Sequence, residues 1–394
     1  MTARRRFLIA AACIAGFMMV SRISSAHEPI TTKMTFNREV VRILQRNCLG
    51  CHRPGGVAPM SLATYEEARP WAKAIKEELL ERRMPPWFAA KGFGQFHNAP
   101  SLTQRDIDLI VNWVEGGAPK GDQKDLPETQ LYSSEWPLGP PYLVLSVGPH
   151  EVAGDADEHC FITAPTNLKE DRMIAAIDLR PGVGSVVRSA AFYVQSGSAP
   201  NEKAVGKNGE GKDIDNLLAT WMPGQKRTAL TQGYGLLLPA RSRIKVDIQY
   251  RGSGEAVKDS SEVGIYFAKT PVNRQVLNFA PAREKVQGNR LKALLVIPDD
   301  MEAVGITPTG DSTVESLEVT AYRPDGTSEA LIWTRLNKTG WAPTYYYKRP
   351  VILPKATRVE VICYLSNAED GNASDPPASP RQLCDLLLAV QSQK

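Results

Sequence analysis

The sequence has few histidines and no apolar run long enough to cross a membrane. It contains only five histidines and six cysteines among 394 residues, which excludes any site that needs many imidazoles. The main apolar stretch, residues 7–20, is shorter than the about 20 residues that a membrane-spanning helix needs. We therefore expect no transmembrane segment in the mature chain.

The sequence also has almost no excess of charge of one sign. The formal net charge is +4, with 47 basic and 43 acidic residues. Four of the basic residues, Arg4, Arg5, Arg6 and Arg22, lie in the first 26 residues, which contain no acid. The rest of the chain is formally neutral, so binding to nucleic acid is not expected.

Residues 1–26 have the pattern of a signal peptide. Three arginines precede the apolar run, and Ser24-Ser25-Ala26 supplies small residues for cleavage. We therefore expect an exported, periplasmic protein. The segment Arg4-Arg5-Arg6-Phe7-Leu8 also resembles a twin-arginine signal, and both export routes stay open.

The strongest chemical motif is Cys48-Leu49-Gly50-Cys51-His52. A CxxCH segment places two thiols one helical turn apart, which matches the two vinyl groups of heme, and the next imidazole can ligate the iron. A zinc site would need further Cys or His pairs, and a redox dithiol would need a βαβ context. The motif predicts one covalent heme c, held by Cys48 and Cys51, with His52 as an iron ligand.

Helical patterns surround this motif. Asn37 is expected to cap a helix that runs into it, residues 65–83 are predicted to form a second helix, and Thr103 is expected to open a third that ends at Gly116-Gly117. The apolar face expected for the second helix consists of Trp71, Ile75, Leu79 and Leu80. The pattern predicts a small all-α cytochrome c domain over residues 33–122.

The second axial ligand of the iron is predicted to be Met84. It ends the second helical pattern and precedes Pro85-Pro86, whose extended backbone would hold the thioether. His97 is the alternative and would give a bis-histidine heme of lower potential. Met60 is interpreted as a packing residue near the heme edge.

The pattern changes to short β runs after a polar linker at 123–141. The later part contains a repeat, since Leu238-Pro239 and the strand 242–246 match Leu353-Pro354 and the strand 357–361 at a constant spacing of 115 residues. We predict two tandem all-β sandwich domains, over 142–270 and 271–394.

Several short motifs are shared with a known family. They are CLGCH at 48–52, APMSL at 58–62, RMPPW at 83–87, Trp113 with GGAP at 116–119, EWPLGP at 135–140, RPG at 180–182, Pro223-Gly224, RPDG at 323–326 and LPK at 353–355. On these motifs the mature chain resembles exported bacterial proteins that join a cytochrome c domain to a copper type II, ascorbate-dependent monooxygenase domain, related to peptidylglycine α-hydroxylating monooxygenase. The resemblance implies two jelly-roll-like sandwiches, each of which carries one copper in that family.

The copper ligands of that family are missing from this sequence. Their aligned positions read Val187-Arg188-Ser189-Ala190, Gln249, Thr309-Gly310-Asp311 and Cys384-Asp385-Leu386-Leu387. Only His150 and His159 remain in the β region, and copper(II) sites of this kind need imidazole nitrogens. We therefore expect no copper and no copper hydroxylase activity.

Two smaller metal hypotheses remain from the other histidines. His27 would become the N-terminus after cleavage, and His150 lies near the pair His159-Cys160 in sequence; a flexible terminus and ordinary packing are the favoured interpretations. Cys363 with Cys384 is the pairing we favour for a disulfide, with Cys160 left as a thiol.

The sequence thus predicts a periplasmic single-heme cytochrome that transfers electrons. The β region would serve as a binding or docking scaffold, and a redox partner protein or a larger electron-transfer complex is expected. The alternative is an oxidoreductase whose β domains still bind a substrate while the heme takes its electrons. A purely structural subunit is a third reading.

Overall fold

The computed structural model describes most of the chain after the predicted signal peptide. The described residues are 32–100, 102–128, 136–155, 157–195, 217–225, 229–287, 289–309, 314–336, 343–365 and 384–391. Residues 1–26, predicted to be a signal peptide, and His27 lie outside them. Within these residues no helix combines the length and apolar character required to cross a membrane.

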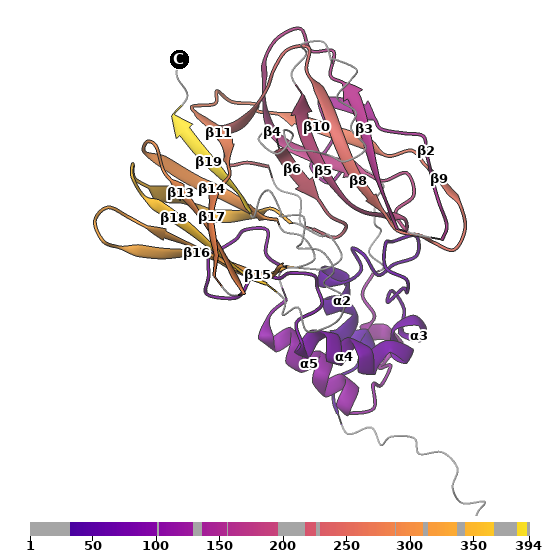
Figure 1. Cartoon of the computed structure of the whole chain (residues 1–394). Coiled ribbons are helices and arrows are strands. Elements are labelled where there is room, and N and C mark those ends of the chain that lie inside the picture. The colour runs from indigo at the N-terminus through magenta and orange to yellow at the C-terminus, as the bar shows by residue number, and fades with distance from the viewer. Residues whose placement is uncertain are drawn as a thin grey trace, which may run out of the picture.

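The N-terminal region is helical and lies at one end of the molecule, below both β domains in Figure 1. Its elements are η1 (Phe36–Val40), α2 (Val41–Asn47), α3 (Tyr65–Ala68), η2 (Arg69–Trp71), α4 (Ala72–Leu80), α5 (Gln104–Glu115) and η3 (Gln123–Asp125). Their apolar side chains form one core, in which Leu44, Ile110 and Trp113 are fully buried.

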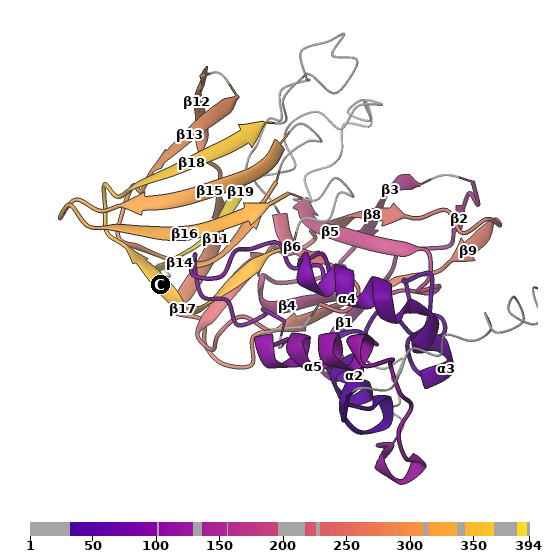
Figure 2. The same ribbon diagram turned by 90° about the horizontal axis from the view of Figure 1, so that it is seen from below.

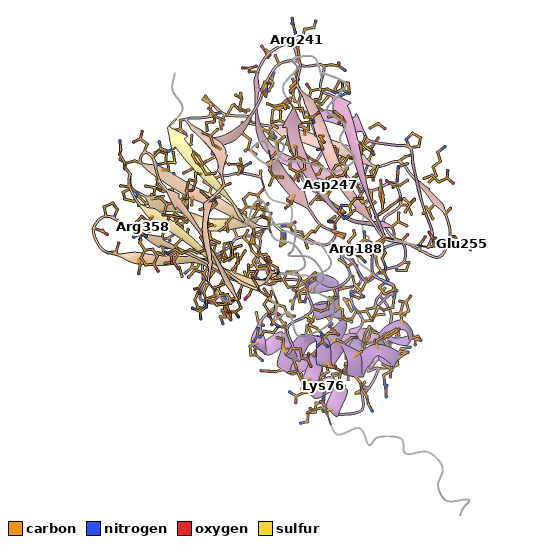
Figure 3. The ribbon with its side chains drawn as sticks, viewed as in Figure 1. Lys76, Arg188, Arg241, Asp247, Glu255 and Arg358 are labelled. Carbon is orange, nitrogen blue, oxygen red and sulfur yellow. The ribbon has the colours of Figure 1, made fainter. Side chains whose placement is uncertain are left out.

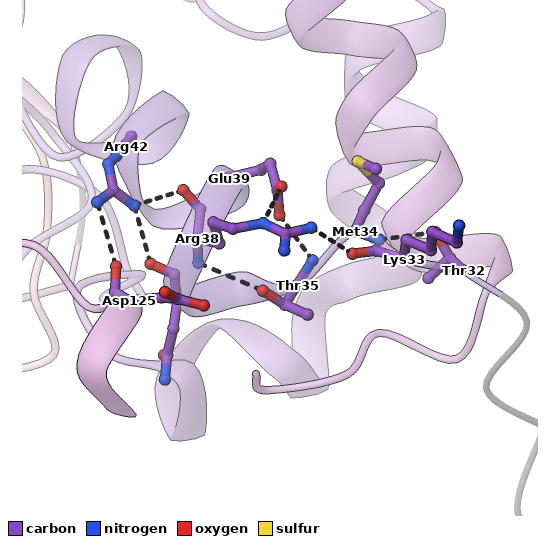
Figure 4. Close-up of polar contacts among 9 residues, drawn as sticks. Thr32, Lys33, Met34, Thr35, Arg38, Glu39, Arg42 and Asp125 are labelled. Atoms are coloured by element: carbon purple, nitrogen blue, oxygen red, sulfur yellow. Dashed lines mark hydrogen bonds and ion pairs between the residues drawn. The ribbon is translucent and has the colours of Figure 1, made fainter. Parts of the chain in front are cut away.

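The first helix begins with Thr35 as its cap, so the prediction of Asn37 was wrong. The Thr35 hydroxyl accepts a hydrogen bond from the backbone N–H of Arg38, and Glu39 accepts one from the Thr35 N–H at 2.9 Å (Figure 4). Asn37 is buried instead, and its amide donates to the carbonyl of Asp122 at 3.0 Å. It ties the first helix to the end of the helical region.

The second predicted helix is present in two pieces and ends at Leu80, not Arg83. A turn of 3₁₀ helix that contains Pro70 separates α3 from α4, because proline has no N–H to donate. Trp71 and Leu80 are 42% and 55% exposed, so the expected apolar face was wrong for these two residues.

The third helix has the predicted start and end. Thr103 and Asp106 form a reciprocal capping box, in which each side chain accepts a hydrogen bond from the backbone N–H of the other residue. Gly116 caps the other end.

The remainder consists of strands. They are β1 (Leu143–Ser146), β2 (His150–Val152), β3 (Glu158–Pro165), β4 (Arg172–Arg180), β5 (Val187–Gln195), β6 (Leu217–Trp221), β7 (Tyr234–Leu238), β8 (Arg243–Tyr250), β9 (Val257–Asp259), β10 (Glu262–Phe267), β11 (Arg274–Phe279), β12 (Ala282–Gln287), β13 (Arg290–Val296), β14 (Met301–Pro308), β15 (Val314–Tyr322), β16 (Ser328–Arg335), β17 (Tyr345–Leu353), β18 (Arg358–Leu365) and β19 (Cys384–Gln391).

These strands form two sandwiches that share one sheet. An eight-stranded sheet has the order β1-β10-β4-β7-β11-β19-β14-β17. The sheet β3-β8-β5-β6 packs on its first half, and the sheet β12-β13-β18-β15-β16 packs on its second half, each across its own apolar core. A helical region followed by antiparallel β-sandwiches, the coarse form of the predicted fold, is confirmed.

The two sandwiches are joined by a parallel strand pair. β7 and β11 pair in parallel, with Arg274 opposite Tyr234, whereas their other neighbours in the sheet pair antiparallel. β10 ends at Phe267 and β11 begins at Arg274. The backbone hydrogen bonds of one sheet therefore run from the first sandwich into the second.

The sequence repeat marks the same turn in both sandwiches. Arg241, between β7 and β8, has φ 57°, and Ala356, between β17 and β18, has φ 65°. Ser242 and Thr357 follow them and are buried, and each donates its N–H to the carbonyl of the preceding proline. In Figure 3, Arg241 lies at the opposite end of the molecule from Lys76 in α4.

A segment of the helical half is built into the second sandwich. Residues 87–98, which we call the strap, run along β16 and β17 through backbone hydrogen bonds, including Ala90 N–H to Trp333 O at 2.7 Å. Phe96 is 5% exposed, and its ring lies 5.3 Å from that of Tyr345. The Asn98 amide donates to the carbonyl of Thr344 at 2.8 Å and closes the strap.

Candidate heme site

The CxxCH motif forms a tight turn at the end of α2. The N–H groups of Cys51 and His52 both donate to the carbonyl of Cys48, at 3.0 and 2.9 Å. The Cys48 N–H donates to Leu44 and continues the pattern of the helix. The turn places both thiols and the imidazole on one short stretch of fixed backbone.

The imidazole of His52 is oriented by a backbone carbonyl. Its Nδ1 lies 3.3 Å from the carbonyl oxygen of Met60. Because a carbonyl only accepts, this contact assigns the proton to Nδ1 and the lone pair to Nε2. Burial lowers the pKa of His52, although the Met60 carbonyl acts in the opposite direction. A neutral imidazole with a fixed tautomer is the form that binds a metal.

Cys48 is set in surroundings that favour uncharged sulfur. Burial first, and then the neighbouring Cys51, raise the pKa of Cys48 to about 12. A thiolate ligand of zinc would carry charge there, whereas a thioether to heme carries none. The donor set therefore fits heme attachment better than a zinc site.

The first sandwich forms one wall of this site. A Cβ built on Gly224, which follows β6 and has φ +70°, would lie 2.6 Å from Sγ of Cys51. A Cβ on Gly50 would lie 3.1 Å from Cα of Gly224, and one on Gly184 would lie 2.9 Å from the carbonyl of Gly55. Seen from below in Figure 2, the helices lie in front of the first sandwich. Sequence reasoning missed this contact, although Pro223-Gly224 was among the shared motifs.

Met84 lies between α4 and the strap. Its N–H donates to the carbonyl of Glu78 at 3.3 Å, and the preceding Arg83 pairs with Glu78 at 2.9 Å. The side chain of Met84 is 38% exposed. Its backbone is thus held from the helical side, while Trp87 anchors the chain to the second sandwich through Tyr345, with ring centroids 4.7 Å apart.

The other candidates for the second ligand have different surroundings. His97 belongs to the strap, where its ring stacks on Tyr346 with centroids 5.7 Å apart and 4° between the planes. Met60 packs against the helical core. The structure therefore places His97 against the second sandwich and Met84 four residues after the end of α4.

The positions aligned with the first copper lie together. Ser189 in β5 donates its hydroxyl hydrogen bond to the side-chain oxygen of Gln249 in β8 at 2.8 Å. Arg188 lies where the register between β5 and β8 shifts, and it pairs with Asp157 at 2.7 Å. Two polar side chains thus bond to each other where the resemblance would place two copper ligands.

The strands that adjoin the positions aligned with the second copper are neighbours in the large sheet. Pro308 in β14 is opposite Cys384 in β19, and Ile306 is opposite Leu386. Ile306 and Leu386 are both fully buried. Thr307 bonds to Thr344 at 2.8 Å. Of the aligned residues, 310 and 311 lie outside the described part of the chain.

Two smaller hypotheses concern a metal site at His150, His159 and Cys160 and a disulfide between Cys363 and Cys384. His159 points toward Asp247, with Nδ1 and Oδ1 3.4 Å apart, while Cys160 points toward His150, so the structure does not bring these three residues together. In the described residues no group of three His, Cys, Asp or Glu side chains is arranged to hold a metal ion. The pairing of Cys363 with Cys384 is untested, since the side chain of Cys384 lies outside the description.

Comparisons with known proteins identify no family for this chain. No protein-family model matches it, and no curated protein matches it significantly. Among solved structures, it is similar to the major capsid protein P2 of bacteriophage PM2, with 11% identity, 62% of this chain and 95% of the other covered, and a TM-score of 0.27. Allantoicase gives 8% identity over 59% of this chain and 77% of the other, with a TM-score of 0.17. At such scores the similarity says nothing about activity.

Proposed function

We propose that this protein is a single-heme c-type cytochrome of the periplasm that transfers electrons. The observation that carries the proposal is the fixed imidazole of His52, directly after two thiols one helical turn apart. The Nδ1–H of His52 donates its hydrogen bond to the Met60 carbonyl, so the Nε2 lone pair is the one available to iron.

Four residues would hold the cofactor. Cys48 and Cys51 would form the thioethers to the heme, and His52 and Met84 would ligate its iron. The bound heme supplies one-electron Fe(III)/Fe(II) chemistry, and a methionine ligand favours a relatively high potential. Around it, Met60 orients His52, and Gly224 covers the sulfur of Cys51.

The β region acts in this proposal as a copper-free scaffold related to the monooxygenase family. The contact between Ser189 and Gln249 supports that relation, because the alignment assigns both positions to one former copper site. A redox partner protein or a larger electron-transfer complex would bind this region, and no nucleic acid is involved.

Two cavities of different size lie in the described β region, and one of them is lined by residues of both sandwiches. That cavity measures about 10 Å³, room for one water molecule, and His97, Tyr234 and Tyr346 are among its lining residues. An organic substrate would not fit this cavity. The other cavity, of about 380 Å³ and lined by Pro149, Glu151, Ala256, Val257 and Lys258, is where the alternative function, a substrate-binding oxidoreductase, would hold its substrate.

Metal and heme analysis of the purified protein tests the proposal. We expect about one iron per chain, copper well below one per chain, and a covalent heme that stays with the polypeptide after denaturation. His52→Ala should change the visible spectrum of any heme that remains, whereas His97→Gln should leave it unchanged. Two tightly bound coppers, or a protein without covalent heme after expression with heme-attachment machinery, would refute the proposal.

A further inference from the structure

Cys160, His150 and Glu158 form a cluster in the first sandwich, separate from the CxxCH motif. Sγ of Cys160 lies 3.4 Å from Nδ1 of His150. Nε2 of the same ring lies 3.1 Å from Oε1 of Glu158. Glu158 and Cys160 are two residues apart in β3 and so share a face of that strand, while His150 comes from β2. A thiol, an imidazole and a carboxylate are therefore connected in that order.

The imidazole is held by its surroundings. Its ring stacks on that of Tyr250, with centroids 5.1 Å apart and 18° between the planes. The Tyr250 hydroxyl donates to the buried carboxylate of Asp259 at 3.0 Å, so the stacking partner is itself fixed. Oε1 of Glu158 also accepts a hydrogen bond from the N–H of Ala153 at 3.3 Å. The base and its carboxylate are thus preorganised.

A nucleophile within hydrogen-bond reach of a base, with the base oriented by a third group, is the arrangement of an activated nucleophile. We propose that Cys160 is a thiol activated by His150 and Glu158, and that it exchanges with low-molecular-weight disulfides to form a mixed disulfide. β3 is the edge strand of its sheet and Cys160 is half-buried, so a small disulfide can approach it.

The exchange needs no other redox reagent. The thiol proton of Cys160 moves to Nδ1 of His150, and the sulfur electron pair forms a bond to one sulfur of the incoming disulfide. The disulfide bond of the reagent breaks, and the leaving thiolate takes the proton back from His150. Cys160 is oxidised to a disulfide, and the leaving half of the reagent is reduced to a thiol. Glu158 stabilises the imidazolium that exists between these steps.

The reaction should depend on the base because the thiol does not ionise readily alone. Burial first, and then the carboxylates of Glu158 and Asp247, raise the pKa of Cys160. A thiol in such surroundings is a poor nucleophile unless a base removes its proton. Dependence on His150 therefore distinguishes an activated thiol from one that is merely accessible.

The test uses purified full-length protein and the disulfide 5,5′-dithiobis(2-nitrobenzoate), with mass spectrometry to locate the adduct. We expect Cys160 to react first and His150→Ala to react about 100-fold more slowly. Free imidazole should restore part of the rate of that variant. Glu158→Gln, which loses the charge, should also be slower than the wild type.

The matched control is His159→Gln. This neighbouring histidine is 56% exposed and faces Asp247, so its loss should leave the rate unchanged. Equal rates for wild type and His150→Ala, no rescue by imidazole, or an adduct only at another cysteine would each overturn the proposal. If circular dichroism shows that His150→Ala does not fold, His150→Gln takes its place. The same loss of reaction rate is then expected for His150→Gln.

Discussion

Gly224 of the first sandwich lies directly against the sulfur of Cys51 in the helical region, so that a Cβ at position 224 would stand 2.6 Å from it. Gly224→Ala should therefore separate the two regions or displace the thiol. We expect a loss of at least about 1 kcal/mol from the positive φ alone, with the collision added to it, and less heme attached per chain. Thermal unfolding and the heme absorbance per polypeptide measure both effects.

Gly254 supplies the matched control for that substitution. It has φ +89°, and no atom lies within 4 Å of a Cβ built on it. Gly254→Ala should lose stability through backbone strain only and keep its full heme content. Equal heme content in the two variants would show that the contact with Cys51 has no role in attachment.

Replacing Met84 and replacing His97 should have different effects on the coordination of the iron. If Met84 is the second ligand, Met84→Ala opens a coordination position, so the ferrous protein should bind carbon monoxide, which the wild type does not. The midpoint potential should fall as well, because a thioether ligand stabilises Fe(II). Carbon monoxide binding by His97→Gln, and not by Met84→Ala, would assign the ligand to His97.

Phe96 is expected to be a large contributor to the stability of the second sandwich. It is 5% exposed, and the centroid of its ring lies 5.3 Å from that of Tyr345 and 5.2 Å from that of Tyr347. Phe96→Ala should cost about 3–5 kcal/mol in the free energy of unfolding. Phe93, in the same strap, is 38% exposed, and Phe93→Ala should cost no more than about 1.5 kcal/mol. Chemical denaturation compares them, and similar losses would contradict the burial of Phe96.

Two aspartates should affect stability with opposite signs as pH changes. Burial raises the pKa of Asp247, against the opposing effect of His159. Hydrogen bonds from Thr327 lower the pKa of Asp325. A raised carboxyl pKa means that the folded state binds the proton more tightly, so stability is lost as pH rises through the range between the unfolded and folded values. A lowered pKa means that stability is present at neutral pH and is lost as pH falls.

Asp247→Asn should therefore be more stable than the wild type at neutral pH, with the gain shrinking in acid. Asp325→Asn should be less stable at neutral pH, and its deficit should also shrink in acid. Melting temperatures across the acidic and neutral range measure both. A gain for Asp247→Asn that grows as pH falls would contradict the assigned direction.

Local signals in the sequence predicted the elements that depend on near neighbours. The capping box of Thr103 and Asp106 needs only residues three apart, and the CxxCH turn needs five. The repeat also carried local information, because Arg241 and Ala356 adopt the same positive φ in the same turn. Such features follow from chain geometry over a few residues.

Contacts between distant segments were not predictable in this way. Asn98 bonds to Thr344, and Gly224 covers Cys51, yet neither pair leaves a periodic pattern in the sequence. The choice of Thr35 over Asn37 as the helix cap depends on the same kind of contact, since Asn37 is held by Asp122. The CxxCH motif of the candidate site was therefore predictable from the sequence. The residues that surround it, such as Gly224, could be found only from the folded structure.

The strap has a consequence for how the protein unfolds. Trp87 and Phe96 belong in sequence to the helical half but pack into the core of the second sandwich, while Gly224 ties the first sandwich to the helical region. Together with the parallel pairing of β7 and β11, these links connect each of the three regions to the other two. We expect a single calorimetric transition, in which the helical region melts together with both sandwiches.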